Sequence, residues 1–366
     1  MAATVIAADT NTTQGQDLFE FNTWFKASIM ETKKTDKLLN SGIIAYNDEL
    51  AGKMAAGGMV VEVPYWKDLA AGATDSGFNQ QVSTDKTTDV ATPNTISMIQ
   101  AQTPYLRRNF GLSSADLSAA IEGEDPMGIM VQRVEPSWSR IRQEILKSVL
   151  SGILRTGMTI DSTNMFFKYA DATTPTNITS ESILEAEAML GEYSDDVTVM
   201  MVSPTQMLQL KKANLIDYVP DSDGKVDIAT YLGKRVIVTN DLITFNGAGD
   251  SAYGASTTQK SYMAVLFRPG AIQYAETMAK TPVETERQAA QGAGEGVENM
   301  WFRRHMCFHP VGFSYDPGES KGFDTKGRGL SAAKASPSNA ELAAATAWSA
   351  IAEERAQVPF VGLLTN

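Results

Sequence analysis

The stretch that most constrains the fold of this chain runs from Asp125 to Arg155 and has the pattern of one long amphipathic helix. Its apolar residues recur every three or four positions, which places them on one helical face: Met127, Met130, Val134, Trp138, Ile141, Ile145, Val149 and Ile153. Asp125 suits the N-cap position and Pro126 the first turn, and Gly157 follows the pattern as a stop signal. Such a helix would be roughly 45 Å long, longer than most globular domains need.

Pro136 is the feature that conflicts with a single continuous helix. A proline inside a helix removes a hydrogen bond and clashes with the preceding turn. It therefore predicts either a kink or a second helix that begins at Trp138, with Glu135 as the last residue outside it. The pattern fits an ordinary core helix with a solvated outer face, and also a structural spine onto which other elements or other subunits are laid.

The charges of this stretch oppose those of the whole chain. After the N-cap candidate Asp125, from Pro126 to Arg155, five basic residues stand against two acidic ones, which gives +3 in a chain of net charge −12: Arg133, Arg140, Arg142, Lys147 and Arg155 against Glu135 and Glu144. The net charge of −12 argues against nonspecific binding of nucleic acid by the whole surface. Any contact with nucleic acid would therefore be local.

A second long element is expected before the spine. Residues 59–66 (MVVEVPYW) and 95–110 (TISMIQAQTPYLRRNF) are β-like, and the segment between them is polar and rich in Gly, Ser, Thr and Asp. A loop of this length is uncommon within a compact domain. We therefore expect a long hairpin that projects from the body and needs a partner surface to order it. Its tip has a net charge of −2, from Lys67 and Lys86 against Asp68, Asp75, Asp85 and Asp89. Residues 1–16 are small and polar and predict a flexible arm.

The segment that follows the spine reads as compact α/β. We expect a helix capped by Thr179 or Ser180 and a buried strand at Val197–Val202. Ser203, followed by a proline, predicts the start of another helix, and Gly233–Val238 predicts a second strand. Alternating helices and strands of this kind are typical of a small α/β domain.

From Ser261 onward the chain reads as mostly β. Three runs could form an antiparallel set: Tyr262–Phe267, Ile272–Glu276 and Val283–Gln288. The longest run, Val297–Tyr315, alternates between two faces. One face carries Met300, Phe302, Met306 and Phe308, and the other Trp301, Arg303, His305, Cys307 and His309. Ser338 and Glu341 form a capping-box pattern for a helix that extends to Ala352, before an apolar tail.

The search for a catalytic, cofactor or metal site is negative. QGAGEG at 291–296 resembles a phosphate-binding glycine loop, but it precedes a strand and lacks the lysine of a P-loop. His305, Cys307 and His309 could offer metal ligands on one strand face, but with two histidines and one cysteine in the chain a structural face is favoured. DSDG at 221–224 lacks the spacing of a calcium loop. We therefore expect no catalytic residues, no cofactor and no metal. No apolar run is long enough to span a membrane.

Several motifs, taken in order, resemble the major capsid proteins of tailed bacteriophages of the Hong Kong 97 type. They are SGIIAYNDEL at 41–50, VVEVPYWKDL at 60–69, AAIEGEDPMGIM at 119–130, MMVSPTQMLQLKKANLI at 200–216, YLGKRVIVTND at 231–241, RRHMCFHPVGFSYD at 303–316, and SPSNAELAAATAW at 336–348 with VPFVGLLTN at 358–366. None of these is a catalytic signature. Each motif alone is weak, and their shared order and spacing over nearly the whole chain make the resemblance specific.

The resemblance implies an α+β fold of the Hong Kong 97 type. Its parts would be an N-terminal arm at 1–58, an extended hairpin loop at 59–110 that lies over a neighbouring subunit, a peripheral domain with a long spine helix and a β-sheet at 111–177 and 264–366, and an α/β axial domain at 178–263. These boundaries come from the family resemblance and not from the patterns above.

The resemblance also implies a function: a major capsid protein, not an enzyme, whose pentamers and hexamers close into an icosahedral head around packaged double-stranded DNA. The chain would be found in the virion after assembly in the cytoplasm of a bacterial host. A separate scaffolding protein, a portal and a decoration protein would be partners, with DNA nearby but not specifically bound. Two alternatives stay open. An encapsulin-type shell would reveal itself by bound cargo protein, and a soluble enzyme by turnover that is lost on changing His305 or His309.

The charges suggest one contact between subunits. We expect the acidic tip of the hairpin to dock on the basic face of a neighbour's spine, through Asp75, Asp85 and Asp89 on one side and Arg133, Arg140 and Arg142 on the other. Each exposed pair contributes about 0.2–1 kcal/mol, so the contact would set register more than total stability. Reversal of Arg140 and Arg142 to Glu should then impair shells and leave subunit folding intact.

Overall fold

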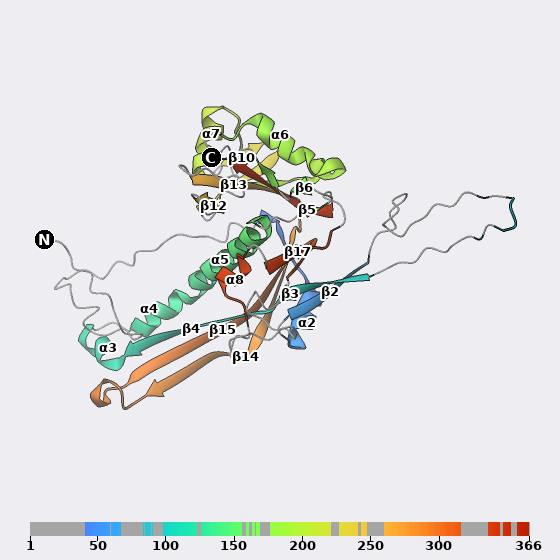
Figure 1. Cartoon of the computed structure of the whole chain (residues 1–366). Coiled ribbons are helices and arrows are strands. Elements are labelled where there is room, and N and C mark those ends of the chain that lie inside the picture. The colour runs from blue at the N-terminus through green and yellow to red at the C-terminus, as the bar shows by residue number, and fades with distance from the viewer. Residues whose placement is uncertain are drawn as a thin grey trace.

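Two sheets and one long helix organise the computed structural model (Figure 1). The structure describes residues 41–58, 60–66, 83, 85–88, 90, 98–122, 126–155, 159–160, 163–164, 166–168, 176–220, 227–240, 243–246, 260–315, 336–344, 347–352 and 357–365. In Figure 1 a four-stranded sheet lies below the helix, an eight-stranded sheet lies above it, and a hairpin projects to one side. Helices and sheets are both prominent, which confirms the expected α+β class.

The four-stranded sheet, which we call the spine sheet, is built around one long hairpin. Its order is β1 (Ile44–Tyr46), β14 (Ile272–Gln288), β15 (Val297–Pro310) and β4 (Leu106–Ala115). β14 and β15 pair antiparallel and are joined by a turn that contains the 3₁₀ helix η4 (Gly292–Gly294). Phe302, Met306 and Phe308 of β15 are buried on the helix side of the sheet. The alternation expected along this strand is thereby confirmed.

The spine consists of two helices, α4 (Pro126–Gln132) and α5 (Val134–Arg155). The break between them falls at Arg133, whose backbone N–H donates to the carbonyl oxygen of Met130 at 2.9 Å. Pro136 therefore lies in the first turn of α5, where a backbone N–H would have no intrahelical partner. The expected interruption of the spine is therefore present, and it precedes the proline.

The second helix that Pro136 predicted is present, but the expected start at Trp138 was wrong. α5 begins four residues earlier and includes Glu135, because a proline is tolerated in the first turn of a helix. The apolar stripe is confirmed by the burial of Trp138, Ile145, Val149 and Ile153. The expected N-cap Asp125 and the stop signal Gly157 lie outside the described residues.

The eight-stranded sheet carries two helices on one face. Its strands run β7 (Phe166–Lys168), β18 (Phe360–Thr365), β13 (Lys260–Phe267), β8 (Val199–Val202), β11 (Lys234–Val238), β10 (Asp227–Tyr231) and β9 (Asp217–Pro220), and β12 (Thr244–Asn246) pairs with β13. The helices are α6 (Ser180–Ala188) and α7 (Pro204–Lys212), with the 3₁₀ helix η2 (Gly191–Asp196) after α6. Both expected N-caps are confirmed, since Thr179 and Ser203 each form a capping box.

The two faces of this sheet belong to different cores. Val202, Leu266 and Leu363 pack beneath α6 and α7 in one hydrophobic cluster. Met201 and Val265, on the opposite face, belong to a larger cluster together with buried residues of α5 and β15. The eight-stranded sheet therefore separates two cores, and the larger one joins it to the spine.

Strand pairing in the C-terminal part differs from the expected antiparallel set. Tyr262–Phe267 belongs to β13 and pairs with β8 and β18, not with the two runs that follow it. Those two runs are the ends of the single strand β14, with a register shift between Met278 and Val283. The run expected to end at Tyr315 divides into β15 and β16 (Phe313–Tyr315), because Gly312 has a φ of 89° and turns the chain.

The expected C-terminal helix is much shorter than its pattern suggested. The capping box of Ser338 and Glu341 is present, but α8 spans only Asn339–Leu342. Trp348 lies instead in β17 (Trp348–Ala350), and its indole N–H donates to the carbonyl oxygen of Leu342 at 2.9 Å. This bond to the end of α8 folds the chain back where the apolar spacing alone would continue the helix.

The apolar tail forms β18, a strand inside the eight-stranded sheet. The family resemblance grouped 264–366 with the spine sheet, so the sheets divide the chain differently at this point. The domain boundaries as a whole stay predictions.

The remaining elements surround the projecting hairpin and the far end of the spine. The hairpin consists of β2 (Val60–Trp66) and β3 (Met98–Pro104), which pair antiparallel. α2 (Asp48–Ala55) lies at its root, and α3 (Asp116–Glu122) follows β4. A short pair, β5 (Thr159–Ile160) and β6 (Thr163–Asn164), follows α5. The pairing of β2 with β3 agrees with the hairpin expected from the sequence.

Candidate assembly surfaces

The projecting hairpin is attached to the body by a small buried cluster. Its members come from α2, from the hairpin and its junction with β4, and from the face of the spine sheet away from the helix: Leu50, Met54, Val61, Tyr105, Ala275 and Cys307. Burial raises the pKa of the Cys307 thiol, so this side chain behaves as a small apolar residue. Because the two strands have no core of their own, contacts at the root fix the hairpin to the sheet.

His309 on β15 is the polar member of this contact. Its Nε2 lies 2.6 Å from the Tyr65 hydroxyl and its Nδ1 lies 2.5 Å from the Thr103 hydroxyl. The imidazole is fully buried. Burial lowers the pKa of His309 to about 4 and raises that of Tyr65 to about 12. Both residues are therefore neutral at physiological pH, and the imidazole accepts one hydrogen bond and donates the other.

The other histidine is held in a similar way on the same strand. His305 Nδ1 lies 2.9 Å from the hydroxyl of Tyr105. Burial, and next the positive charge of Arg107, lower the pKa of His305. Among the described residues, no group of three or more His, Cys, Asp and Glu side chains could hold a metal ion. Both histidines are hydrogen-bonded to hydroxyl groups.

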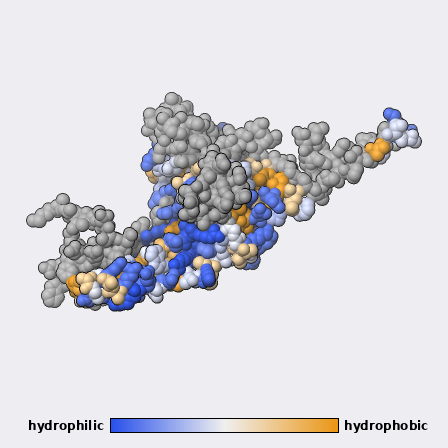
Figure 2. Space-filling view, turned by 60° about the horizontal axis from the view of Figure 1, so that its bottom comes forward, coloured by the Kyte–Doolittle hydropathy of each residue, from blue (hydrophilic) through white to orange (hydrophobic). Residues whose placement is uncertain are grey.

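Further out, the hairpin exposes apolar side chains. Trp66 is 71% exposed, and Met98, its partner in register, is 48% exposed. Figure 2 shows hydrophobic residues gathered near the place where the hairpin leaves a largely hydrophilic body. Exposed apolar groups of this kind commonly mark contact surfaces.

The short described segment 85–88, which contains the exposed Asp85, lies far from the body in Figure 1. Asp75 and Asp89 lie outside the described residues.

The spine arginines are partly engaged within the chain. The Arg142 side chain is only 13% exposed, and its Nη2 lies 3.5 Å from a carboxylate oxygen of Glu135. Glu135 also accepts a hydrogen bond from Arg304 at 2.5 Å. Arg133 and Arg140 are half-buried. Part of the positive charge expected on the outer face of the spine is therefore neutralised by the chain itself.

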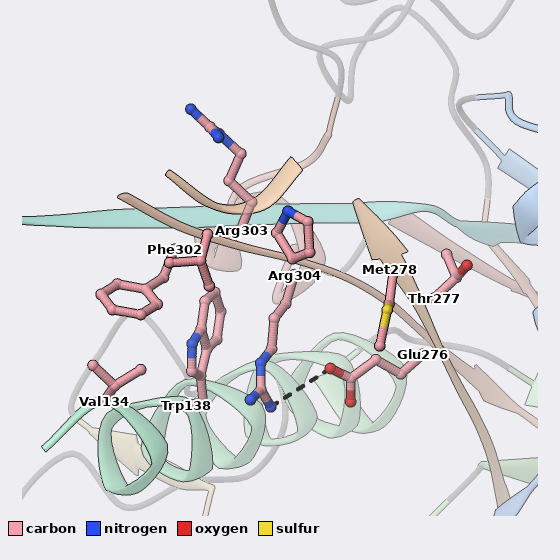
Figure 3. A pocket seen from close by; sticks show the side chains of 10 residues that line it. Val134, Trp138, Glu276, Thr277, Met278, Phe302, Arg303 and Arg304 are labelled. Atoms are coloured by element: carbon pink, nitrogen blue, oxygen red, sulfur yellow. Dashed lines mark ion pairs between the residues drawn. The ribbon is translucent and has the colours of Figure 1, made fainter. Parts of the chain in front are cut away.

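A cleft of about 460 Å³ opens between α5 and the spine sheet (Figure 3). It is lined by Val134, Trp138, Glu276, Thr277, Met278, Pro282, Val283, Phe302, Arg303 and Arg304. Arg304 lies over the Trp138 ring, 5.2 Å from its centroid, and pairs with Glu276 at 3.6 Å. Met278, at the rim, is 86% exposed. The sequence signalled Trp138 as part of the apolar stripe. It gave no signal for Met278, because the register shift of β14 interrupts the alternation there.

No helix in the part of the chain that the structure describes has the length and apolar character required to cross a membrane.

No protein-family model matches the chain. A curated relative does: the chain is similar to the major capsid protein of Bacillus phage SPP1. The two are 30% identical over 289 residues, which cover 78% of this chain and 82% of that protein. A match of this length includes most of both sequences and reaches well beyond any single motif.

Solved capsid structures share the fold. The capsid of cyanophage P-SCSP1u matches with a TM-score of 0.52 and 13% identity, over 81% of this chain and 91% of that one. The head of Helicobacter pylori bacteriophage KHP40 matches with a TM-score of 0.51 and 9% identity, over 93% of both chains. At such low identity the likeness establishes the architecture alone, and it agrees with the fold that the resemblance implied.

Proposed function

The chain belongs to the major capsid proteins of tailed bacteriophages, with the Hong Kong 97-type fold, and we propose that its copies form pentamers and hexamers that close into an icosahedral head around double-stranded DNA. The observation that carries this proposal is the 30% identity to a phage major capsid protein over 78% of the chain. Capsid proteins act by assembling with copies of themselves into shells, and the virion is therefore the location of this chain.

The surface of the single chain supports assembly. Trp66 on the hairpin and Met278 at the rim of the cleft are large apolar residues that are mostly exposed. Burial of apolar surface stabilises association by roughly 25 cal/mol per Å² before the costs of ordering are subtracted. Both side chains are large and mostly exposed in the single chain, so contact with a neighbouring subunit could bury them.

Electron microscopy of the purified chain, expressed alone, tests the proposal. Closed polyhedra, or free pentamers and hexamers, are the expected products, and the diameter of the polyhedra would give the triangulation number. A compact monomer or dimer would call for co-expression with the products of neighbouring genes, which should include any scaffolding protein. Failure to form shells in both experiments would contradict the proposed function.

For the contact between subunits, the proposed partners are the acidic hairpin tip and the basic side of a neighbour's spine. Asp75, Asp85 and Asp89 supply the negative charge in this hypothesis. Arg142 is a poor site for the charge reversal first considered, because a glutamate there would face Glu135 inside the same chain. A reversal on the hairpin avoids this difficulty at Asp85, since the described segment 85–88 lies far from the body.

The test is a triple variant, Asp75→Lys, Asp85→Lys and Asp89→Lys. We expect fewer or misshapen shells in electron micrographs and unchanged thermal unfolding of free subunits. The matched control replaces the same three residues by Glu, which keeps the charge and should assemble normally. Because salt screens exposed charges over roughly 10 Å at 0.1 M ionic strength, the difference between the two variants should shrink at high salt. Normal shells from the lysine variant would rule out the docking hypothesis.

Other partners follow from the proposed role. We propose assembly in the cytoplasm of the bacterial host, with a separate scaffolding protein, a portal and, in some heads, a decoration protein. The net charge of −12 favours only nonspecific proximity to packaged DNA. The encapsulin alternative lacks support, since the comparisons above are with phage capsids. An enzymatic role would require turnover, which assays of His305 and His309 variants would detect.

A further inference from the structure

Both strands of the projecting hairpin reach the same imidazole. Tyr65 belongs to β2 and Thr103 to β3, yet the two are not partners in register, because Thr103 lies opposite Val61 and Tyr65 lies opposite Ile99. Their hydroxyls nevertheless converge on the two ring nitrogens of His309, at 2.6 and 2.5 Å. The Tyr65 ring also stacks on the imidazole, with 5.9 Å between centroids. One side chain of the spine sheet is thus bonded to two separate points on the hairpin.

The other buried contacts between the hairpin and the spine sheet are apolar, and apolar contacts do not require one particular orientation. The cluster around Cys307 and Val61 excludes water but tolerates small sliding and rotation of the strands. Hydrogen bonds do not tolerate such movements, since they weaken steeply once the distance or the angle departs from the preferred range. Among the described residues, two further polar contacts lie nearer the surface. The Gln102 backbone N–H donates to the Ser314 hydroxyl at 2.9 Å, and the Arg107 guanidinium donates to the carbonyl oxygen of Gly58 at 2.5 Å.

We propose that His309 is a positioning residue that fixes the direction of the projecting hairpin relative to the spine sheet. A shift of the hairpin would separate at least one hydroxyl from the ring and leave a buried imidazole nitrogen without a partner, which is unfavourable. One hairpin angle is therefore preferred in a single chain, before any neighbour binds. This inference goes beyond the proposed function, because it concerns the geometry that each subunit brings to assembly.

His305 provides an internal comparison. It is on the same strand and the same sheet face as His309, and it also bonds to a tyrosine hydroxyl, that of Tyr105. Tyr105, however, directly precedes Leu106, which is already paired with Met306 in the spine sheet. The His305 bond therefore joins neighbouring strands of one sheet and does not determine where the hairpin points.

The experiment measures the hairpin angle directly. Nitroxide labels at Gln100→Cys on β3 and Glu286→Cys on β14, both exposed positions, report the distance between hairpin and sheet by pulsed electron paramagnetic resonance. The buried Cys307 is protected from labelling by its raised pKa and lack of exposure. The full chain is used, as free subunits or in shells diluted with unlabelled chain.

We expect one narrow distance distribution for the otherwise native chain. His309→Leu should broaden or displace it, and the amides of β2 and β3 should exchange about tenfold faster or more, while those of β15 keep their protection. His309→Gln, whose amide both donates and accepts, should largely restore the narrow distribution. His305→Leu should leave it unchanged.

Two results would overturn the inference. One is a native distribution in His309→Leu, and the other is equal broadening in His305→Leu. If His309→Leu does not fold, the double variant Tyr65→Phe with Thr103→Val decides, because it removes both hydroxyls and keeps the histidine. The measurement is made within one chain, so its outcome is separate from whether shells form.

Discussion

Single residues set how closely the elements approach one another, and Gly152 on α5 is a clear case. A Cβ added there would lie 2.6 Å from Trp348 Nε1 and closer still to the carbonyl oxygen of Leu342, which is backbone. Gly152→Ala should therefore destabilise the subunit by roughly 1–3 kcal/mol through overpacking. Urea unfolding of free subunits measures this free energy. Gly52→Ala on α2 is the control: it has open space around it and should stabilise by about 0.5–1 kcal/mol through lower unfolded-state entropy. Equal effects of the two substitutions would contradict the packing.

His309 predicts a pH dependence at the same scale. Its folded-state pKa of about 4 lies below the ordinary value of 6.5. Between these two pH values the imidazole is therefore protonated in the unfolded chain and neutral in the folded chain. This contribution to stability is complete above about pH 6.5 and is lost as the pH falls to about 4, for a total of roughly 3 kcal/mol. Unfolding free energies measured across this window should show a smaller decline in His309→Gln than in the native chain. Identical declines would show that the imidazole does not carry the effect.

At the scale of elements, the position of Pro136 in α5 can be tested. The proline either lies in the first turn without strain or strains the interior of the helix. If the proline lies in the first turn, as in the structure, Pro136→Ala should change stability by no more than about 0.5 kcal/mol. If it strained the helix interior, its removal would stabilise by about 3 kcal/mol. Thermal unfolding of free subunits decides. A proline placed within α5, as in Lys147→Pro, is the control and should destabilise by about 3 kcal/mol or more.

The elements also show what the sequence can and cannot predict. The spine was predictable because the period of Trp138, Ile145 and Val149 is a local signal, and the caps at Thr179 and Ser203 are local as well. The partners of β13 were not, because strand order depends on contacts between distant segments that no local pattern encodes. The same reason hid the hairpin attachment. His309 is 206 residues from Thr103 and 244 from Tyr65, and the alternation of β15 placed it on a face without saying what covers that face.

At the scale of the whole molecule, the last strand of the chain joins the two cores. β18 pairs with β13 and β7 inside the eight-stranded sheet and is buried on both faces. Leu363 packs in the cluster under α6 and α7, and Leu364 packs in the cluster shared with the spine. Neither core is complete until β18 is in place, so the stability of the eight-stranded sheet depends on that of the spine.

This arrangement predicts that the free subunit unfolds as one cooperative unit. Leu363→Ala and Leu364→Ala should each cost about 2–5 kcal/mol, since both side chains are fully buried. Both should lower the midpoint of the same single calorimetric transition, although they empty space in different cores. Leu208→Ala on α7, where the side chain is 52% exposed, is the control and should change the midpoint little. Two transitions, each moved by only one of the two variants, would show that the cores unfold independently. The sheet between them would then be a boundary between domains, and β18 would not couple them.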